Sequence, residues 1–329
     1  MDPWSEYLLF LFKGLTSVVL ILVVAGGLRT LLSRGRQEER GMVQIRHLNQ
    51  QFERMRHSMQ SAVSSRKSMG GIWQRLHQRR RERRHKLPQE QQRRRMFIVN
   101  FHGDIIASSV ASLREEVSAI LAVAEARDEV VVRLESSGGV VHAYGLAASQ
   151  LVRIKDRGVA LTVLVDKVAA SGGYLMACVA DRLVAAPFAV LGSIGVVSQI
   201  PNFNRLLKSH DVDFEQFTAG EYKRTVTLFG ETTEAGRAKL QQEVETAHNL
   251  FKAFLKTHRQ SLDVEQVASG EHWFGSEALG LGLVDELRTS DDYLLNASET
   301  ADLYEVTYPV KKKHWLAQLL GLAGRIAAR

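Results

Sequence analysis

Cysteine is nearly absent from this 329-residue chain, which contains only Cys178. One cysteine cannot form an internal disulfide bond, so the fold is not held by a disulfide framework, and the redox state of its compartment stays open. The same scarcity excludes a metal site built from clustered cysteines. The chain also shows no internal repeat strong enough to indicate a repeat architecture.

Aromatic residues are missing from the strongly basic segment Arg75–Arg95, where ten Lys and Arg stand against Glu82 and Glu90. Without interleaved aromatic residues or a recognisable module, this segment argues against nucleic-acid binding. A solvated linker or an arm that lies on an anionic membrane surface fits the composition better, and a regulated cleavage site is a third reading. Much of the net charge of +7 lies in this region, before Met96.

Charge is also scarce between Tyr7 and Leu28, where Lys13 is the single charged residue. The run is long enough to cross a bilayer. Acidic residues precede it and no A-x-A site follows it, which favours an uncleaved anchor over a signal peptide. We therefore expect a membrane anchor over residues 1–33, a basic juxtamembrane linker over 34–95, and membrane lipids as partners of both. Arginines after the run favour a cytoplasmic body, although nearby acidic residues and Lys13 leave its side open.

Strands and helices alternate along residues 96–290, which we expect to form the folded domain. Apolar strand patterns begin at Met96, Glu129, Leu161 and Leu183, and helical patterns separate the first three. This alternation predicts an α/β fold with a largely parallel sheet and right-handed crossovers. A long helix is predicted over 233–261. Residues 291–329 are expected to be a C-terminal extension with a short amphipathic helix near His314–Ile326.

The stretch Leu161–Asp181 joins a buried strand to a helix through Ala169-Ala170-Ser171-Gly172-Gly173. Serine and glycines at such a junction suit an exposed nucleophile, because free N–H groups at a helix start can receive an oxyanion. The alternative reading is a tight turn with Ser171 as a helix cap. A second glycine pair, Gly138-Gly139, follows the preceding strand, and open α/β sheets place their sites at this edge. Gly139 and Gly172 could therefore direct N–H groups at one carbonyl oxygen.

A nucleophilic Ser171 needs a base, and three residues are candidates. His142 lies on a predicted helix and His210 in a polar loop, where histidines are usually surface residues. Lys223, in Gly220-Glu221-Tyr222-Lys223, is the third. A lysine acts as a base only where burial away from carboxylates favours its neutral form. The residues alone do not decide among them. Leu175, Val140 and Val196 are expected to line the crevice.

Five of these stretches together resemble the signal peptide peptidase A family of Ser/Lys-dyad serine proteases. The matching motifs, in order, are SSGGVV at Ser136, AASGGYLMACVAD at Ala169, APFAVLGSIGV at Ala186, GEYKR at Gly220 and GLGLVDEL at Gly280. The resemblance covers most of residues 96–287. One departure is Ser137, where the family often has proline.

The resemblance implies a crotonase/ClpP-like fold that associates into homo-oligomers and needs no cofactor. It implies that Ser171 is the nucleophile, Lys223 the general base, and Ser193 the residue that orients the lysine. Gly139 and Gly172 would form the oxyanion hole, with Gly138 as the alternative to Gly139. The implied function is a bacterial inner-membrane endopeptidase that cleaves hydrophobic or signal-peptide-like peptides through an acyl-enzyme.

Three other functions remain to be weighed. A Ser-His-Asp peptidase would need a histidine soon after the nucleophile, and none occurs between Ser171 and His210. A catalytically inactive membrane scaffold would use the basic arm to bind anionic lipid or partner proteins. Acyl-CoA chemistry would rest on fold analogy alone.

Overall fold

The computed structural model describes residues 41–64 and 93–309. The predicted anchor at 7–28, most of the basic segment and the predicted helix at His314–Ile326 lie outside the described residues. The described residues from Val43 onward belong to one compact unit. Among the helices in the described ranges, none combines the length and the apolar character that a bilayer crossing requires.

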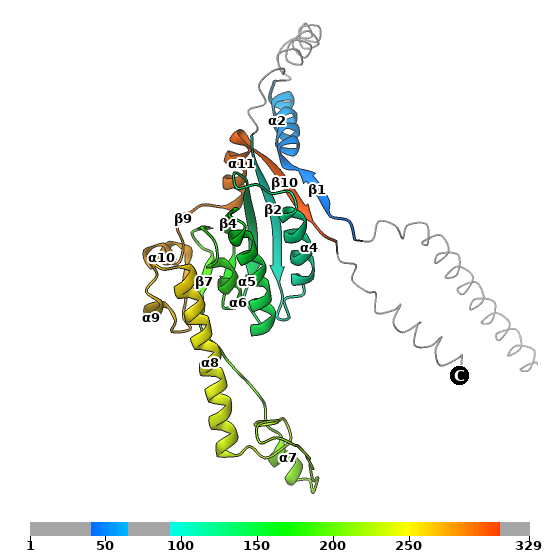
Figure 1. Ribbon diagram of the computed structural model, residues 1–329, viewed down its shortest axis with the longest axis vertical. Helices are drawn as coiled ribbons and strands as arrows, with labels where there is room; N and C mark the ends of the chain where they lie inside the picture. Colours follow the sequence, from blue (N-terminus) through cyan, green and yellow to red (C-terminus); the bar gives the residue numbers. More distant parts are fainter. Residues whose placement is uncertain (1–40, 65–92, 310–329) are drawn as a thin grey trace, which may run out of the picture. The chain divides into compact units, whose positions relative to one another are not determined.

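A mostly parallel sheet forms the centre of this unit, as predicted (Figure 1). Its core strands are β2 (Arg94–Gly103), β3 (Glu129–Ser136), β4 (Ala160–Val165) and β6 (Arg182–Ala185), which pair in this order and all run parallel. Helices α4 (Val110–Leu121) and α5 (Val141–Asp156) connect the first three strands. This confirms the predicted alternation of strands and helices, with a helix connecting each pair of parallel strands.

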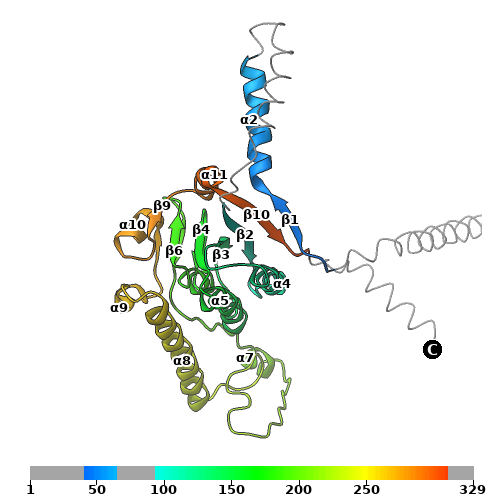
Figure 2. The same cartoon turned by 45° about the horizontal axis from the view of Figure 1, so that its top comes forward.

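Both faces of the sheet are covered, which explains why its strands are nearly continuous apolar runs. Along β2, Phe97, Val99 and Phe101 contribute to the larger core with α4 and α5. The alternate residues Met96 and Ile98 face a smaller core on the other side. That core is closed by helices α2 (Leu48–Ser64) and α11 (Ser290–Thr300) (Figure 2).

The compact unit begins earlier and ends later than the sequence suggested. Residues 44–47, assigned above to the linker, form strand β1 (Gln44–His47), which pairs antiparallel with β10 (Ala301–Thr307). β10 in turn pairs parallel with β2. The side chain of Asn49 fixes the start of α2 here, because it donates to the Ala301 carbonyl at 2.8 Å and accepts from the Leu303 N–H at 2.8 Å. These partners are some 250 residues apart, a separation that local patterns do not reveal.

A smaller set of strands branches from the edge of the main sheet. Strand β5 (Val168–Ala170) pairs parallel with β3 and with β7 (Val190–Gly192), and β7 pairs antiparallel with β8 (His272–Phe274). Helix α6 (Gly172–Ala177) follows β5 directly. This branch carries the Ser171 junction away from β4 and places it beside the end of β3.

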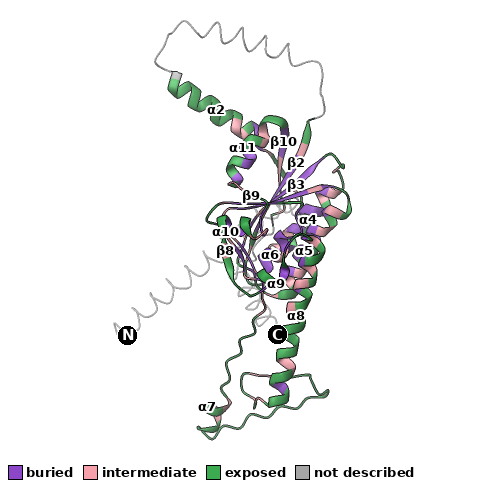
Figure 3. Ribbon diagram, turned by 90° about the vertical axis from the view of Figure 1, so that its left-hand side faces the viewer, coloured by how far each residue is buried: buried purple, intermediate pink, exposed green. Residues whose placement is uncertain are grey.

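The remaining elements lie between β7 and α11. Helix α7 (Asn204–Lys208) is followed by an irregular segment and by the long helix α8 (Glu234–His258), which begins where predicted, with the Thr233 side chain accepting from the Gly236 N–H. Then come α9 (Val264–Val267), α10 (Gly275–Gly280) and the short strand β9 (Glu286–Leu287), which closes the sheet beside β6. Figure 3 shows that α7 and the adjoining end of α8 are largely exposed, whereas the sheet is buried.

Candidate active site

Ser171 lies at a strained junction between β5 and α6. Its φ of 51° and ψ of −120° place it outside the regions that non-glycine residues normally adopt. The conformation is held from both sides, because the Ser171 N–H donates to the Gly192 carbonyl at 2.8 Å and the Ser171 carbonyl accepts from the Leu175 N–H at 2.9 Å. Strain of this kind at a strand-to-helix turn is typical of an exposed nucleophile.

Three parallel strands end together at this point. β3 runs into Gly138-Gly139, β5 into Ser171, and β7 into Ser193. In the register of the sheet, Ala170 pairs with Gly192, so Ser171 and Ser193 follow adjacent positions on strands about 4.8 Å apart. The structure thus brings the predicted nucleophile, one glycine pair and Ser193 to one sheet edge. The hydroxyl of Ser193 has no hydrogen-bond partner within residues 41–64 and 93–309.

The glycines allow backbone to approach Ser171 closely. A Cβ on Gly138, whose φ is +89°, would lie 2.7 Å from the Gly172 nitrogen, and one on Gly139 would lie 2.1 Å from the Ile105 carbonyl oxygen. The Gly138 N–H already donates to Ser136 Oγ at 3.0 Å. The N–H groups of Gly139 and Gly172 have no acceptor in the described part of the chain. This pattern favours Gly139 over Gly138 as an oxyanion donor.

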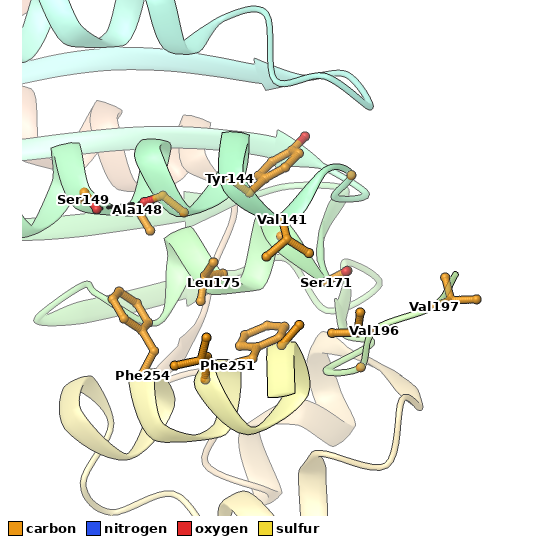
Figure 4. A pocket seen from close by; sticks show the side chains of 16 residues that line it. Val141, Tyr144, Ala148, Ser149, Ser171, Leu175, Val196, Val197, Phe251 and Phe254 are labelled. Carbon is orange, nitrogen blue, oxygen red and sulfur yellow. Dashed lines mark hydrogen bonds between the residues drawn. The ribbon is translucent and has the colours of Figure 1, made fainter. Parts of the chain in front are cut away.

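A largely apolar pocket of about 390 Å³ opens beside Ser171 (Figure 4). Its walls come from α5, α6, α8 and the segment after β7. Leu175 and Val196 line it as expected, but Val141 takes the place predicted for Val140. The full lining is Gly139, Val141, Tyr144, Gly145, Ala148, Ser149, Ser171, Gly172, Leu175, Gly195, Val196, Val197, Ala247, Leu250, Phe251 and Phe254. Such a cavity can hold an apolar side chain next to the serine hydroxyl.

Sequence reasoning missed the part that α8 plays in this pocket. The apolar spacing of Ala247, Leu250, Phe251 and Phe254 predicted a packed helix face, and the structure shows the same face closing one side of the pocket (Figure 4). It also missed Tyr144, which lies near the start of a predicted helix. Helical periodicity marks which side is apolar but not which cavity that side borders.

Lys223 is not brought to Ser171 within a single chain. Its side chain is exposed, and it is absent from the pocket wall. Its neighbour Tyr222 contacts the Lys239 ammonium at 5.3 Å from the ring centre, and the Thr225 carbonyl packs against Gly236. Both contacts are with the first turns of α8. Lys239 precedes Ala247, the first pocket residue of α8, by about 12 Å of helix.

The two histidines weighed as bases also stay outside the pocket. His142 is exposed on the first turn of α5. His210 is exposed after α7, where its Nδ1 lies 2.9 Å from the Leu206 carbonyl oxygen. Within the residues that the structure describes, no cluster of three or more metal-ligating side chains occurs either.

Comparison with known proteins supplies the family. A model described as "Peptidase family S49 N-terminal" matches residues 2–151, and "Peptidase family S49" matches residues 153–304. A protein of Buchnera aphidicola subsp. Schlechtendalia chinensis named "Probable protease SohB" is 43% identical over 306 residues, which cover 90% of this chain and all of that protein. The chain belongs to peptidase family S49. This confirms the resemblance found in the motifs.

Another S49 relative, named "Probable protease SohB" in Haemophilus influenzae, is 59% identical over 217 residues. The matched part is 66% of this chain and 62% of that protein, so the chain spans less than two thirds of this relative's length. Among solved structures, a substrate-peptide complex of the 1510-N membrane-bound stomatin-specific protease aligns over 70% of this chain, with 13% identity and a TM-score of 0.42. ClpP1 from Listeria monocytogenes aligns over 61%, with 13% identity and a TM-score of 0.38.

Proposed function

We propose that this S49 chain is a serine endopeptidase on a crotonase/ClpP-type fold, with Ser171 as nucleophile and Lys223 as general base. The observation that carries the proposal is the setting of Ser171. A strained serine, two N–H groups that have no acceptor among the described residues, and an apolar pocket meet at one sheet edge. These are the parts that acyl transfer from a peptide needs.

In the proposed reaction, the neutral amine of Lys223 takes the proton of the Ser171 hydroxyl as the oxygen attacks the peptide carbonyl. The N–H groups of Gly139 and Gly172 stabilise the negative charge on the tetrahedral intermediate. The lysine then protonates the leaving amine, and water hydrolyses the acyl-enzyme. Ser193, which follows β7 beside Ser171, would accept or donate a hydrogen bond that orients the lysine.

This mechanism requires Lys223 to reach Ser171 by a route that a single chain does not provide. The segment that carries Lys223 exposes apolar side chains, including Phe214, Phe217 and Tyr222. Exposed aromatic side chains on one segment favour burial against another surface. We infer that the chain works as a homo-oligomer in which assembly orders this segment and delivers Lys223 to an active site.

The pocket suggests the substrate class. Tyr144, Leu175, Val196 and Phe251 would accept an apolar side chain next to the cleaved bond. The apolar run at 7–28 would hold the enzyme at a bacterial inner membrane, where hydrophobic and signal-peptide-like segments are released. A cleavage survey should therefore show apolar residues at the cut site, and a preference for charged residues there would contradict this assignment.

Two alanine variants test the dyad. Ser171→Ala and Lys223→Ala should each abolish hydrolysis of an apolar fluorogenic peptide, because each removes a group needed in every turnover. Ser118→Ala, on the exposed side of α4, and Lys208→Ala, on α7, are matched controls that should keep wild-type rates. Thermal unfolding should be the same in all four variants. Full activity in Ser171→Ala or in Lys223→Ala would refute the dyad.

Because Lys223 lies outside the pocket, a second function is also considered. In it, the chain is a catalytically inactive scaffold that binds anionic lipid or partner proteins through the basic arm. A fluorophosphonate probe separates the two. Labelling at Ser171 supports the enzyme, because only an activated serine reacts. A folded full-length chain that is never labelled supports the scaffold.

A further inference from the structure

Tyr144 is completely buried beneath the predicted oxyanion loop, and its hydroxyl has no role in the proposed mechanism or in the apolar pocket. Its ring and its hydroxyl have separate partners. A Cβ on Gly172 would lie 2.4 Å from Tyr144 Cγ, so the ring packs directly against the backbone that carries the Gly172 N–H. In Figure 4 the hydroxyl points away from Phe251 and Phe254. The hydroxyl therefore serves something other than the pocket.

The hydroxyl of Tyr144 belongs to a chain of hydrogen bonds with a defined direction. It donates its one hydrogen to the Asp104 carbonyl oxygen at 2.8 Å. Its contact with Ser136 Oγ, at 2.5 Å, must therefore be donated by the serine. Ser136 Oγ in turn accepts from the Gly138 N–H at 3.0 Å. Three hydrogen bonds thus run from Gly138 through Ser136 and Tyr144 to Asp104.

This chain of bonds is enclosed tightly. A Cβ on Gly103 would lie 2.4 Å from both Ser136 Oγ and Tyr144 Oη, so no larger residue fits there. Burial raises the pKa of the Tyr144 phenol, so it stays a donor at ordinary pH. A buried, fully satisfied network holds its members in one geometry. The element it fixes is the glycine loop at 138–139.

We propose that Tyr144 and Ser136 are positioning residues that hold the oxyanion loop for catalysis by Ser171. The inference rests on the proposed function. Because the Gly138 N–H donates to Ser136 Oγ, the loop is held in one orientation. In that orientation the next N–H, that of Gly139, is free to donate to the substrate oxyanion. At the same time, the Tyr144 ring fixes the position of the Gly172 backbone that packs against it. One side chain thereby places both oxyanion donors.

The test measures how fast a fluorophosphonate acylates Ser171 in the full-length chain, separating the maximal rate constant from the concentration for half-saturation. Tyr144→Phe keeps the ring but removes the hydroxyl. Loss of an oxyanion donor costs about 100- to 1000-fold, so a misplaced one should lower the rate constant about tenfold. The half-saturating concentration should stay within about twofold, because the pocket wall is intact. Tyr293→Phe is the matched control, since this buried tyrosine likewise loses a hydrogen-bonded hydroxyl, which donates to Glu129 on the other face of the sheet.

Ser136→Ala provides a second route to the same conclusion if Tyr144→Phe folds poorly. It should slow acylation to a similar extent, and the double variant should be no slower than the slower single variant, because one chain of bonds is broken either way. The inference would be overturned if the fold-losses in acylation rate of the two single variants multiplied in the double variant. A wild-type acylation rate in Tyr144→Phe would overturn it as well. Absence of labelling in the wild-type chain would instead refute the proposed function.

Discussion

At the scale of single residues, the site depends on glycines, whose lack of a side chain lets other groups pack closely. Gly172 has no room for a side chain, since a Cβ would meet the Tyr144 ring at 2.4 to 2.8 Å. The sequence predicted this glycine, and Gly139 with it, from strand ends that carry glycine beside serine. It could not predict Tyr144 as the obstacle, because a tyrosine within an ordinary helical pattern carries no mark of its neighbours.

Gly172→Ala should therefore harm both stability and activity. Overpacking against a buried ring costs about 1–3 kcal/mol. Displacing the Gly172 N–H should also slow acylation of Ser171 by about 100-fold. Gly280→Ala, at the end of α10, is the matched control, because nothing lies within 4 Å of its added Cβ. Chemical denaturation and probe labelling provide the two measurements. Equal unfolding free energies in the two variants would contradict the packing around Gly172.

At the scale of elements, β10 shows where local pattern was insufficient. Its residues lie in the segment expected to be a C-terminal extension, yet β10 pairs with β1 on one side and β2 on the other. The end of β10 is also tied to α4, because the Tyr308 N–H donates to Glu116 at 2.8 Å. Burial raises the pKa of that carboxyl to about 7, only partly offset by this hydrogen bond.

Glu116 should make stability depend on pH in a defined direction. Between about pH 4.5 and 7 the folded chain keeps the proton that the unfolded chain loses, so the free energy of unfolding should fall as pH rises. Removing the charge in Glu116→Gln should abolish this component and stabilise the chain by up to about 3 kcal/mol at pH 8, with little effect near pH 4. Melting temperatures across this range test it. Glu115→Gln, on the exposed side of α4, is the control, and the same profile in both variants would exclude Glu116 as the source.

At the scale of the whole molecule, a single chain does not bring the two residues of the proposed dyad together. Ser171 lies on a buried, well-packed core, while Lys223 lies on a segment that contacts the first turns of α8 and the residues around α7. α8 joins the two, since its later turns form one side of the pocket. Assembly that moves or covers the Lys223 segment would therefore act on the pocket as well.

Phe217→Asp should prevent assembly and peptide hydrolysis together. Phe217 is 89% exposed in the single chain, so a charge there leaves the fold intact but opposes burial against a second copy. Phe188→Asp is the control, because that side chain is 84% exposed and lies outside the segment. In Phe217→Asp, the sedimentation coefficient and the rate of peptide hydrolysis should both fall. In Phe188→Asp, neither should change. An unchanged sedimentation coefficient in Phe217→Asp would remove the argument for this surface.

By itself, the sequence determined the parallel α/β core, the S49 family and the serine–glycine junctions, because each is encoded within a few consecutive residues. The tertiary structure alone decided which of those parts meet. Pairing of β3, β5 and β7 brought Ser171, Gly139 and Ser193 to one edge, and α8 closed the pocket. Residues 44–47 and 301–307 joined the sheet as β1 and β10, and α2 packed against it. It also left Lys223 outside the pocket. These outcomes depend on contacts between residues far apart in the chain, whose free energies no local pattern records.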